Sequence, residues 1–305
     1  MSTTAAEALP RNPLMRALYK PPFIGILAFL AAFMPIALAH ALMVLTEYIF
    51  GEEHRYTAAF VMGAFSIYLL WLGVKLRREA LGTWLGFFAG TLVWTSWVEF
   101  AFMFYGRTLY PVPVQIENGA VIQNPEYMMM TTSVGCLMAV FFYTFFNKDT
   151  RCNFYVWFHR RLGLNMGERA SGKDRNIAAI TFMETVMVTW FFYVAQLAIY
   201  DPTIIGADHW IAYAAFFVCL VWGIYLSARL IKYKRVSSAV RYAIPTSIIL
   251  WCDVEFLSRW DMLTEVWLRP WDFWKECTLI LLGCIVAIVL TMRSPKKLSE
   301  IEEVG

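Results

Sequence analysis

The sequence predicts an all-α integral membrane protein with eight transmembrane helices, arranged as a tandem duplication of a four-helix unit. Three observations lead to this fold class. The composition is too apolar for a soluble domain, eight long apolar segments alternate with loops of opposite basic content, and several short motifs recur in the same order in both halves. The alternation also predicts that both termini lie in the cytoplasm.

The composition identifies lipid as the solvent of this chain. Of its 305 residues, 59% are apolar and only 16% are charged, whereas a soluble domain carries about 25% charged residues. A soluble core could not bury so much apolar surface, so we expect contact with the lipid bilayer. The six cysteines form no CxxC pair, and we predict neither a disulfide framework nor a thiolate zinc site.

The first apolar run is predicted to be an uncleaved membrane span. It follows a polar segment, residues 1–22, and continues for more than twenty residues. That is longer than the apolar part of a signal peptide, and no small-residue cleavage site ends it. Residues 1–22 are therefore predicted to form a cytoplasmic N-terminal segment.

Eight segments have the length and apolarity that a membrane-spanning helix requires, about 20 residues each. They are residues 23–48, 57–75, 82–105, 128–147, 177–200, 209–231, 238–258 and 272–292. We predict two four-helix membrane units, 23–147 and 177–292. A basic cytoplasmic linker, 148–176, joins them, and a cytoplasmic tail, 293–305, follows the second.

The basic residues predict the orientation, because loops on the cytoplasmic side are enriched in lysine and arginine. With the N-terminus inside, 21 of the 26 basic residues lie on the cytoplasmic side. The outer side keeps Arg55, Arg107, Arg259, Arg269 and Lys275. The bias follows every loop, and it predicts a multi-pass protein of a bacterial inner membrane.

The outer face is predicted to be acidic and rich in tryptophan. Fourteen of the 23 acidic residues lie at or near it, and tryptophans are dense between 251 and 274. The loop 259–276 is a candidate docking surface for a periplasmic protein, within a membrane complex. The alternative is an ordinary solvated face with an aromatic belt at headgroup level. No nucleic-acid partner is predicted.

An internal repeat relates the two halves. Each half has the motifs Gly-x-acid-His, Val-Glu-Phe and Gly-Cys-x-x-Ala, in that order, at 51–54 and 206–209, 98–100 and 254–256, and 135–139 and 283–287. The offset is 155 residues for the histidines, 156 for the glutamates and 148 for the last motif. We predict two units related by an axis along the membrane normal. Such symmetry would bring the matching acids and histidines to one leaflet.

These repeated acids and histidines form a candidate metal or cation site near the periplasmic leaflet. The residues are His54, Glu53, Glu99, Asp208, His209 and Glu255. Carboxylate and imidazole ligands suit iron, copper or zinc, and helical bundles hold two irons with four carboxylates and two histidines. However, adjacent acid and histidine side chains diverge by about 100° on a helix. In the alternative reading, the acids stabilise helix N-termini and the histidines are interfacial caps.

Four further ionisable residues are predicted to belong to a proton or ion path: Glu184, Glu47, His40 and Asp253. Ionisable side chains inside a membrane are costly and normally point into the bundle or a wet cavity. The same reasoning applies to Glu99 and Glu255. The spacing of seven from His40 through Glu47 to His54 looks like one helical stripe, but His54 belongs to the next helix.

Three functions are consistent with these features. The first is a membrane subunit whose carboxylate and histidine site serves redox chemistry or metal handling, with iron, copper or zinc as the metal. The second is a transporter that couples a small solute to protons or another cation. The third is a scaffold without catalytic activity that docks a periplasmic partner on the 259–276 loop. The sequence contains no Walker loop, GxSxG, HExxH or dinucleotide motif, so it assigns no reaction.

Overall fold

The computed structural model describes residues 17–76, 79–100, 102, 115–117, 120–123, 132–150, 152–168 and 175–292. Several predictions lie outside the described residues. They concern residues 1–16, Arg77 and Arg78, most of the 103–131 region, residues 169–174 of the basic linker, and the tail 293–305.

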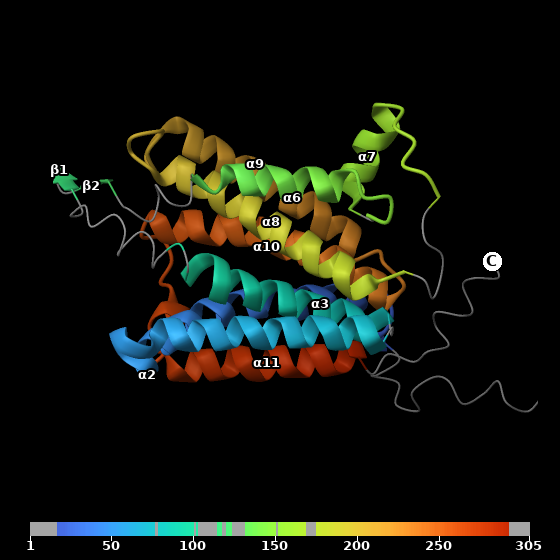
Figure 1. Cartoon of the computed structure of the whole chain (residues 1–305), viewed down its shortest axis with the longest axis horizontal. Helices are drawn as coiled ribbons and strands as arrows, with labels where there is room; N and C mark the ends of the chain where they lie inside the picture. Colours follow the sequence, from blue (N-terminus) through green and yellow to red (C-terminus); the bar gives the residue numbers. More distant parts are fainter. Residues whose placement is uncertain are drawn as a thin grey trace, which may run out of the picture.

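Helices dominate the described residues, as predicted (Figure 1). The principal elements are α2 (Phe23–Leu76), α3 (Glu79–Val93), the π-helix η1 (Trp94–Glu99), α6 (Val134–Phe145), α7 (Asn153–Arg161), α8 (Ile177–Tyr200), α9 (Trp210–Leu230), α10 (Val236–Arg259), the 3₁₀ helix η3 (Val266–Leu268) and α11 (Trp274–Met292). Two short antiparallel strands, β1 (Gln115–Glu117) and β2 (Ala120–Gln123), depart from the all-α prediction. They form a small hairpin beside one end of the bundle.

Four helices, α2, α8, α9 and α11, are long and apolar enough to cross a membrane. Their length and composition support a membrane protein whose surface contacts lipid. The central helix α10 is not among them, although it carries many buried residues. A helix enclosed by other helices does not have to be apolar all round. This position explains how α10 accommodates Asp253 and Glu255.

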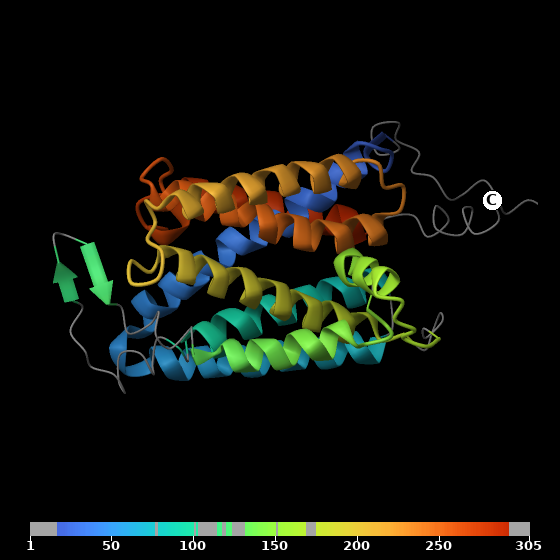
Figure 2. The ribbon, with the colours of Figure 1, turned by 90° about the horizontal axis from the view of Figure 1, so that it is seen from above.

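Helix α2 consists of two antiparallel halves. At Gly51 the backbone leaves the helical region, with φ 62° and ψ −171°, and the chain turns back (Figure 2). Glycine adopts this conformation without the steric cost that a side chain would add. Two contacts join the halves: Thr46 Oγ1 lies 3.9 Å from Met62 Sδ, and Arg55 Nη1 lies 3.9 Å from Glu47 Oε1. The turn coincides with the predicted boundary between residues 48 and 57.

Three connecting segments meet at one end of the bundle, which we call the Gly51 end. Tyr48, just before the Gly51 turn, packs on Trp271 with ring centroids 5.0 Å apart. Trp260 donates a hydrogen bond from Nε1 to the carbonyl oxygen of Ala207 at 3.0 Å. The Gly51 turn, the 201–209 connection and the 260–273 segment therefore share one end (Figures 1 and 2).

The short helix α7 docks at the opposite end. Its Tyr155 is buried and donates from the hydroxyl to Met187 Sδ of α8 at 3.1 Å. The buried imidazole of His159 hydrogen-bonds the carbonyl oxygen of Phe145 at 2.8 Å. Burial raises the pKa of the neighbouring Cys152 thiol to about 11, and Glu184 adds to this shift. Cys152 is therefore a protonated, unreactive thiol at neutral pH.

Small residues bring the inner helices into close contact. A Cβ atom on Gly86 of α3 would overlap the carbonyl oxygen of Ala178 in α8, and one on Gly25 of α2 would lie 2.5 Å from the carbonyl oxygen of Leu230. Glycine and alanine are typical of helix contacts in membranes because they allow backbones to approach closely. The Gly86 contact thus brings α3 close to α8, and the Gly25 contact brings the start of α2 close to the end of α9.

The substitution Gly86→Ala tests the contact between α3 and α8. The added methyl group meets backbone atoms that cannot move independently, so we expect a loss of about 1–3 kcal/mol in the free energy of unfolding. Gly135→Ala in α6 is the matched control, because nothing lies within 4 Å of its added Cβ. Thermal unfolding in detergent measures both. Equal stabilities of the two variants would contradict the close packing.

Candidate functional site

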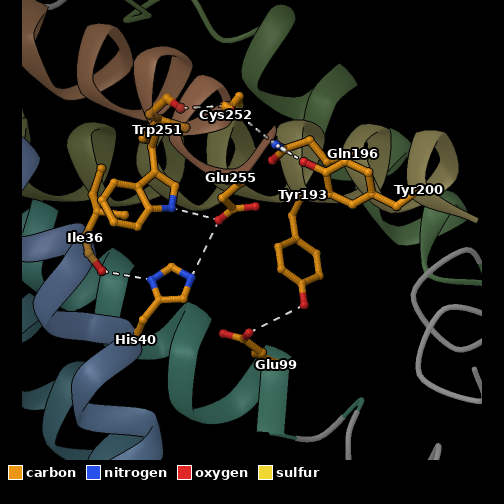
Figure 3. Close-up of polar contacts among 10 residues, drawn as sticks. Ile36, His40, Glu99, Tyr193, Gln196, Tyr200, Trp251, Cys252 and Glu255 are labelled. Carbon is orange, nitrogen blue, oxygen red and sulfur yellow. Dashed lines mark hydrogen bonds and ion pairs between the residues drawn. The ribbon is translucent and has the colours of Figure 1, made fainter. Parts of the chain in front are cut away.

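A cavity of about 60 Å³ lies between α2, α3 with η1, α8 and α10. Most of its wall is apolar, and five of the lining side chains are aromatic: Phe87, Trp94, Phe192, Tyr193 and Trp251. Its ionisable side chains include one histidine, His40, and two glutamates, Glu99 and Glu255. Figure 3 shows these three groups directed toward a common space from three different elements.

Glu255 of α10 lies beside two ring nitrogen atoms. Trp251 Nε1 donates a hydrogen bond to Glu255 Oε1 at 2.7 Å, and His40 Nε2 lies 3.7 Å from the same oxygen (Figure 3). The other ring nitrogen of His40 lies 2.9 Å from the carbonyl oxygen of Ile36. That carbonyl can only accept, so Nδ1 carries a proton. Nε2 and the carboxylate would then present lone pairs to each other unless a further proton is bound. The His40–Glu255 contact therefore joins α2 to α10 through two ionisable side chains.

Glu99 occupies the last position of the π-helix η1. Tyr193 of α8 donates from its hydroxyl to Glu99 Oε1 at 3.4 Å (Figure 3). Short π-helical turns are rare and frequently mark functional sites, because the wider turn changes the direction in which side chains project. Here the wider turn directly follows α3, the helix that packs on α8. The carboxylate faces the cavity across from Glu255.

Aromatic rings and one amide hold the cavity wall together. The His40 ring stacks on Trp251 with centroids 5.4 Å apart, and Trp251 in turn packs on Trp267 at 4.8 Å. Gln196 of α8 donates from Nε2 to the carbonyl oxygen of Cys252 at 3.1 Å, which links α8 to α10 (Figure 3). These contacts restrict the rotation of α10 that would turn Glu255 out of the cavity.

One polar atom of the wall has no hydrogen-bond partner. The side chain of Thr185 lines the cavity, the residue is only 2% exposed, and its hydroxyl makes no hydrogen bond. A buried hydroxyl without a partner costs free energy. The oxygen has almost no accessible surface, so it is enclosed by the wall and is not open to the cavity.

Glu265, in the segment between α10 and η3, extends the site toward the Gly51 end. Burial raises the pKa of its carboxyl group, while the nearby His40 and Arg259 oppose the increase. Glu265 thus interacts electrostatically with the same histidine that pairs with Glu255. From the sequence, Glu265 was predicted only to be one acid of the outer face. Its position in a polar loop gave no signal that it would be half-buried next to a helix residue more than 200 positions away.

The predicted site residues fall into two groups. Glu99 and Glu255, predicted for the metal or cation site, share the cavity with His40, predicted for the ion path. The other four, Glu53, His54, Asp208 and His209, are exposed and do not line it. His209 caps α9 by accepting from the amide of Ile211 at 3.3 Å, in line with the capping alternative. Within the described ranges, no three His, Cys, Asp or Glu side chains converge as a metal site requires.

The remaining residues of the predicted ion path lie elsewhere. Glu47 is near Arg55 in the Gly51 turn, and Glu184 accepts a hydrogen bond from Thr150 Oγ1 at 2.9 Å. Asp253 is 5% exposed, and neither of its carboxylate oxygens has a hydrogen-bond partner. It precedes Glu255 by two positions, so the two side chains project from different faces of α10. None of these three residues lines the cavity.

Comparisons with known proteins identify no relative. No protein-family model, no curated protein and no solved structure matches the chain. Any functional conclusion must therefore come from the cavity and its chemistry.

The substitution Glu265→Gln tests the half-buried position of this side chain. A raised pKa means that the folded state binds the proton more tightly than the unfolded chain, whose glutamates titrate near pH 4.3. Ionised Glu265 therefore destabilises the native protein as the pH rises. We expect the variant to melt at a higher temperature than the wild type at pH 8 and at the same temperature near pH 4. A pH-independent difference would contradict this environment.

Proposed function

We propose that this protein is a polytopic membrane transporter that couples the movement of a small solute to a proton or another monovalent cation. The single observation that carries the proposal is the meeting of His40 and Glu255 across α2 and α10, in a cavity that also contains Glu99. The cation would bind at the His40–Glu255 pair.

The energetic argument concerns the cost of ionisable groups in a membrane. A carboxylate or imidazole inside a bilayer costs several kcal/mol, and such residues usually mark ion or substrate pathways. Two glutamates and a histidine share a largely apolar cavity whose described lining includes no lysine or arginine. The grouping of three ionisable side chains in one largely apolar cavity supports an ion pathway.

Pairs of cavity residues support the tandem duplication. The offset of 156 residues that relates Glu99 to Glu255 also relates His40 to Gln196 and Ile36 to Phe192, and all six residues line the cavity. We propose that a pseudo-twofold axis passes through the cavity and relates the two units. Binding sites of repeat-built transporters commonly lie at the interface between the repeats.

The eight-span count follows from this duplication. The two halves of α2, α3 with η1, and α6 would be the four spans of the first unit. Helices α8, α9, α10 and α11 would be those of the second. The distribution of basic residues favours the Gly51 end as the periplasmic face and both termini in the cytoplasm of a bacterial cell.

Acidic residues on both sides of the cavity outline a route that the cation would follow. Glu265 interacts with His40 from the Gly51 end. From the other direction, Glu184 precedes the cavity-lining Thr185 in α8 and is hydrogen-bonded to Thr150. The route would run from Glu265 through the His40–Glu255 pair and past Thr185 to Glu184.

The other two hypotheses have weaker support. A site for iron, copper or zinc needs several converging donors, and the described side chains offer no group of three. The aromatic 259–276 loop presents the exposed Trp271 and Trp274, which suit a periplasmic partner or the headgroup layer equally well. Elemental analysis and native co-purification would reveal a bound metal or a partner subunit.

A pH jump applied to proteoliposomes tests the proposal. On a solid-supported membrane, the wild type should give a transient current as the cavity takes up protons, because the charge moves within the bilayer. Glu255→Gln should abolish the current and Glu99→Gln should reduce it. The exposed Glu53→Gln is the matched control and should behave as wild type.

Melting temperatures and gel-filtration profiles of the wild type, the three single variants and the double variant establish that each is folded. A wild-type current no larger than that of the folded double variant Glu99→Gln/Glu255→Gln would reject the proposed function.

A further inference from the structure

We propose that the exposed face of α7 binds an anionic phospholipid, with the lipid phosphate on the two arginines at the end of the helix. The inference does not depend on the proposed transport function. It is argued from the two opposite faces of α7, from the order of aromatic and basic side chains along the helix, and from the positive charge at this end of the bundle.

One face of α7 is buried in the protein. Tyr155 and His159 are 1% and 6% exposed, and residues four positions apart lie on the same side of a helix. The Tyr155 ring packs edge-on against Phe141 and Phe145 of α6, with centroids 5.4 and 5.5 Å apart. Together with the hydrogen bonds of Tyr155 and His159, these contacts fix the rotation of α7 against α6 and α8.

The opposite face combines aromatic rings with positive charge. Phe154, Trp157 and Arg161 follow one another at spacings of three and four, so they share one side of the helix, and Arg160 flanks them. Phe154 and Trp157 are 46% and 52% exposed, and both arginines are exposed as well. Arg161 Cζ lies 5.6 Å from the centroid of the Trp157 ring. The described residues therefore leave this aromatic and basic face uncovered.

The apolar and basic ends of this face are separated along α7. Phe154 packs on Trp222 of α9, well before that helix ends at Leu230, with ring centroids 6.3 Å apart. Arg160 and Arg161 belong to the last turn of α7. Figure 1 shows α7 inclined steeply to the long helices, at the end of the bundle away from the Gly51 turn. A short helix with this orientation and this order of side chains is typical of the boundary between acyl chains and headgroups.

The charge of the two arginines is not compensated within the described part of the chain. Neither guanidinium group forms an ion pair with a described acidic side chain. Further exposed basic side chains at this end of the bundle include Lys148, Arg229, Lys232 and Lys234. A phosphate group complements such a surface, because a guanidinium group binds two phosphate oxygens at once.

An anionic phospholipid satisfies both parts of the face. Its phosphate would accept hydrogen bonds from Arg160 and Arg161, and its acyl chains would cover the rings of Trp157 and Phe154. A free phosphate ion would leave those rings in water. A zwitterionic lipid has the phosphate as well, but its cationic headgroup is repelled by the surrounding basic side chains.

Microscale thermophoresis of the labelled full-length protein in neutral detergent tests the inference. Dioleoylphosphatidylglycerol should bind more tightly than dioleoylphosphatidylcholine. The double variant Arg160→Gln/Arg161→Gln should lose about 25-fold in affinity for phosphatidylglycerol, or about 5-fold for each arginine. It should keep its affinity for phosphatidylcholine. The matched control Arg269→Gln/Lys275→Gln removes the same charge from exposed positions at the Gly51 end and should bind like the wild type.

Two more variants separate the charge from the rings. Arg160→Lys/Arg161→Lys keeps the charge and loses the two-pronged geometry, so its loss of phosphatidylglycerol affinity should be smaller than that of the glutamine pair. Trp157→Ala should weaken the binding of both lipids to a similar extent, because the acyl chains that the ring contacts are common to both.

Three outcomes would overturn the inference. The first is equal affinity of the wild type for the two lipids. The second is displacement of phosphatidylglycerol by inorganic phosphate but not by chloride of the same ionic strength, which would indicate a site for a free anion. The third is an equal loss in the control pair, which would show that net charge and not α7 governs binding. The first two comparisons use the wild type, so they decide even if a variant fails to fold.

Discussion

The carboxylate of Glu255 is the group on which the arrangement of the cavity depends. It receives the indole N–H of Trp251 from its own helix and faces His40 of α2. An ionisable group at this depth is tolerated only when partners compensate its charge. The contacts therefore fix the rotation of α10 relative to α2. Through the Gln196 link to Cys252 they also fix the position of α8.

Close helix packing and the ionisable groups have complementary roles. Small residues at Gly25 and Gly86 allow α2 to approach the end of α9, and α3 to approach α8, at the level of the backbone. Where α2, α3, α8 and α10 meet, large aromatic and polar side chains line a mostly apolar cavity that contains Glu99 and Glu255. It lies inside the bundle, where the surrounding helices shield it from lipid.

Much of the fold could be predicted from the order of apolar and polar residues along the chain. Apolar length predicted the helices, and a glycine between two long apolar runs predicted the turn that Gly51 makes. The argument that a lipid-facing acid is too costly also predicted that Glu99 and Glu255 point inward. The adjacent acid and histidine residues were less informative about the position of the site. At Asp208 and His209 the side chains are exposed, and the histidine caps a helix instead of joining a site.

The sequence alone determined that this chain is a mainly helical protein suited to a membrane, and which of its acids could not face lipid, because apolar length and the cost of burying charge are local properties. Only the tertiary structure decided which of those groups meet. The partnership of His40 with Glu255, the half-buried Glu265 and the unpartnered Thr185 all depend on helix rotation and on contacts between distant segments. Those rotations are set by the packing of side chains from several helices at once, which no single segment of the sequence encodes.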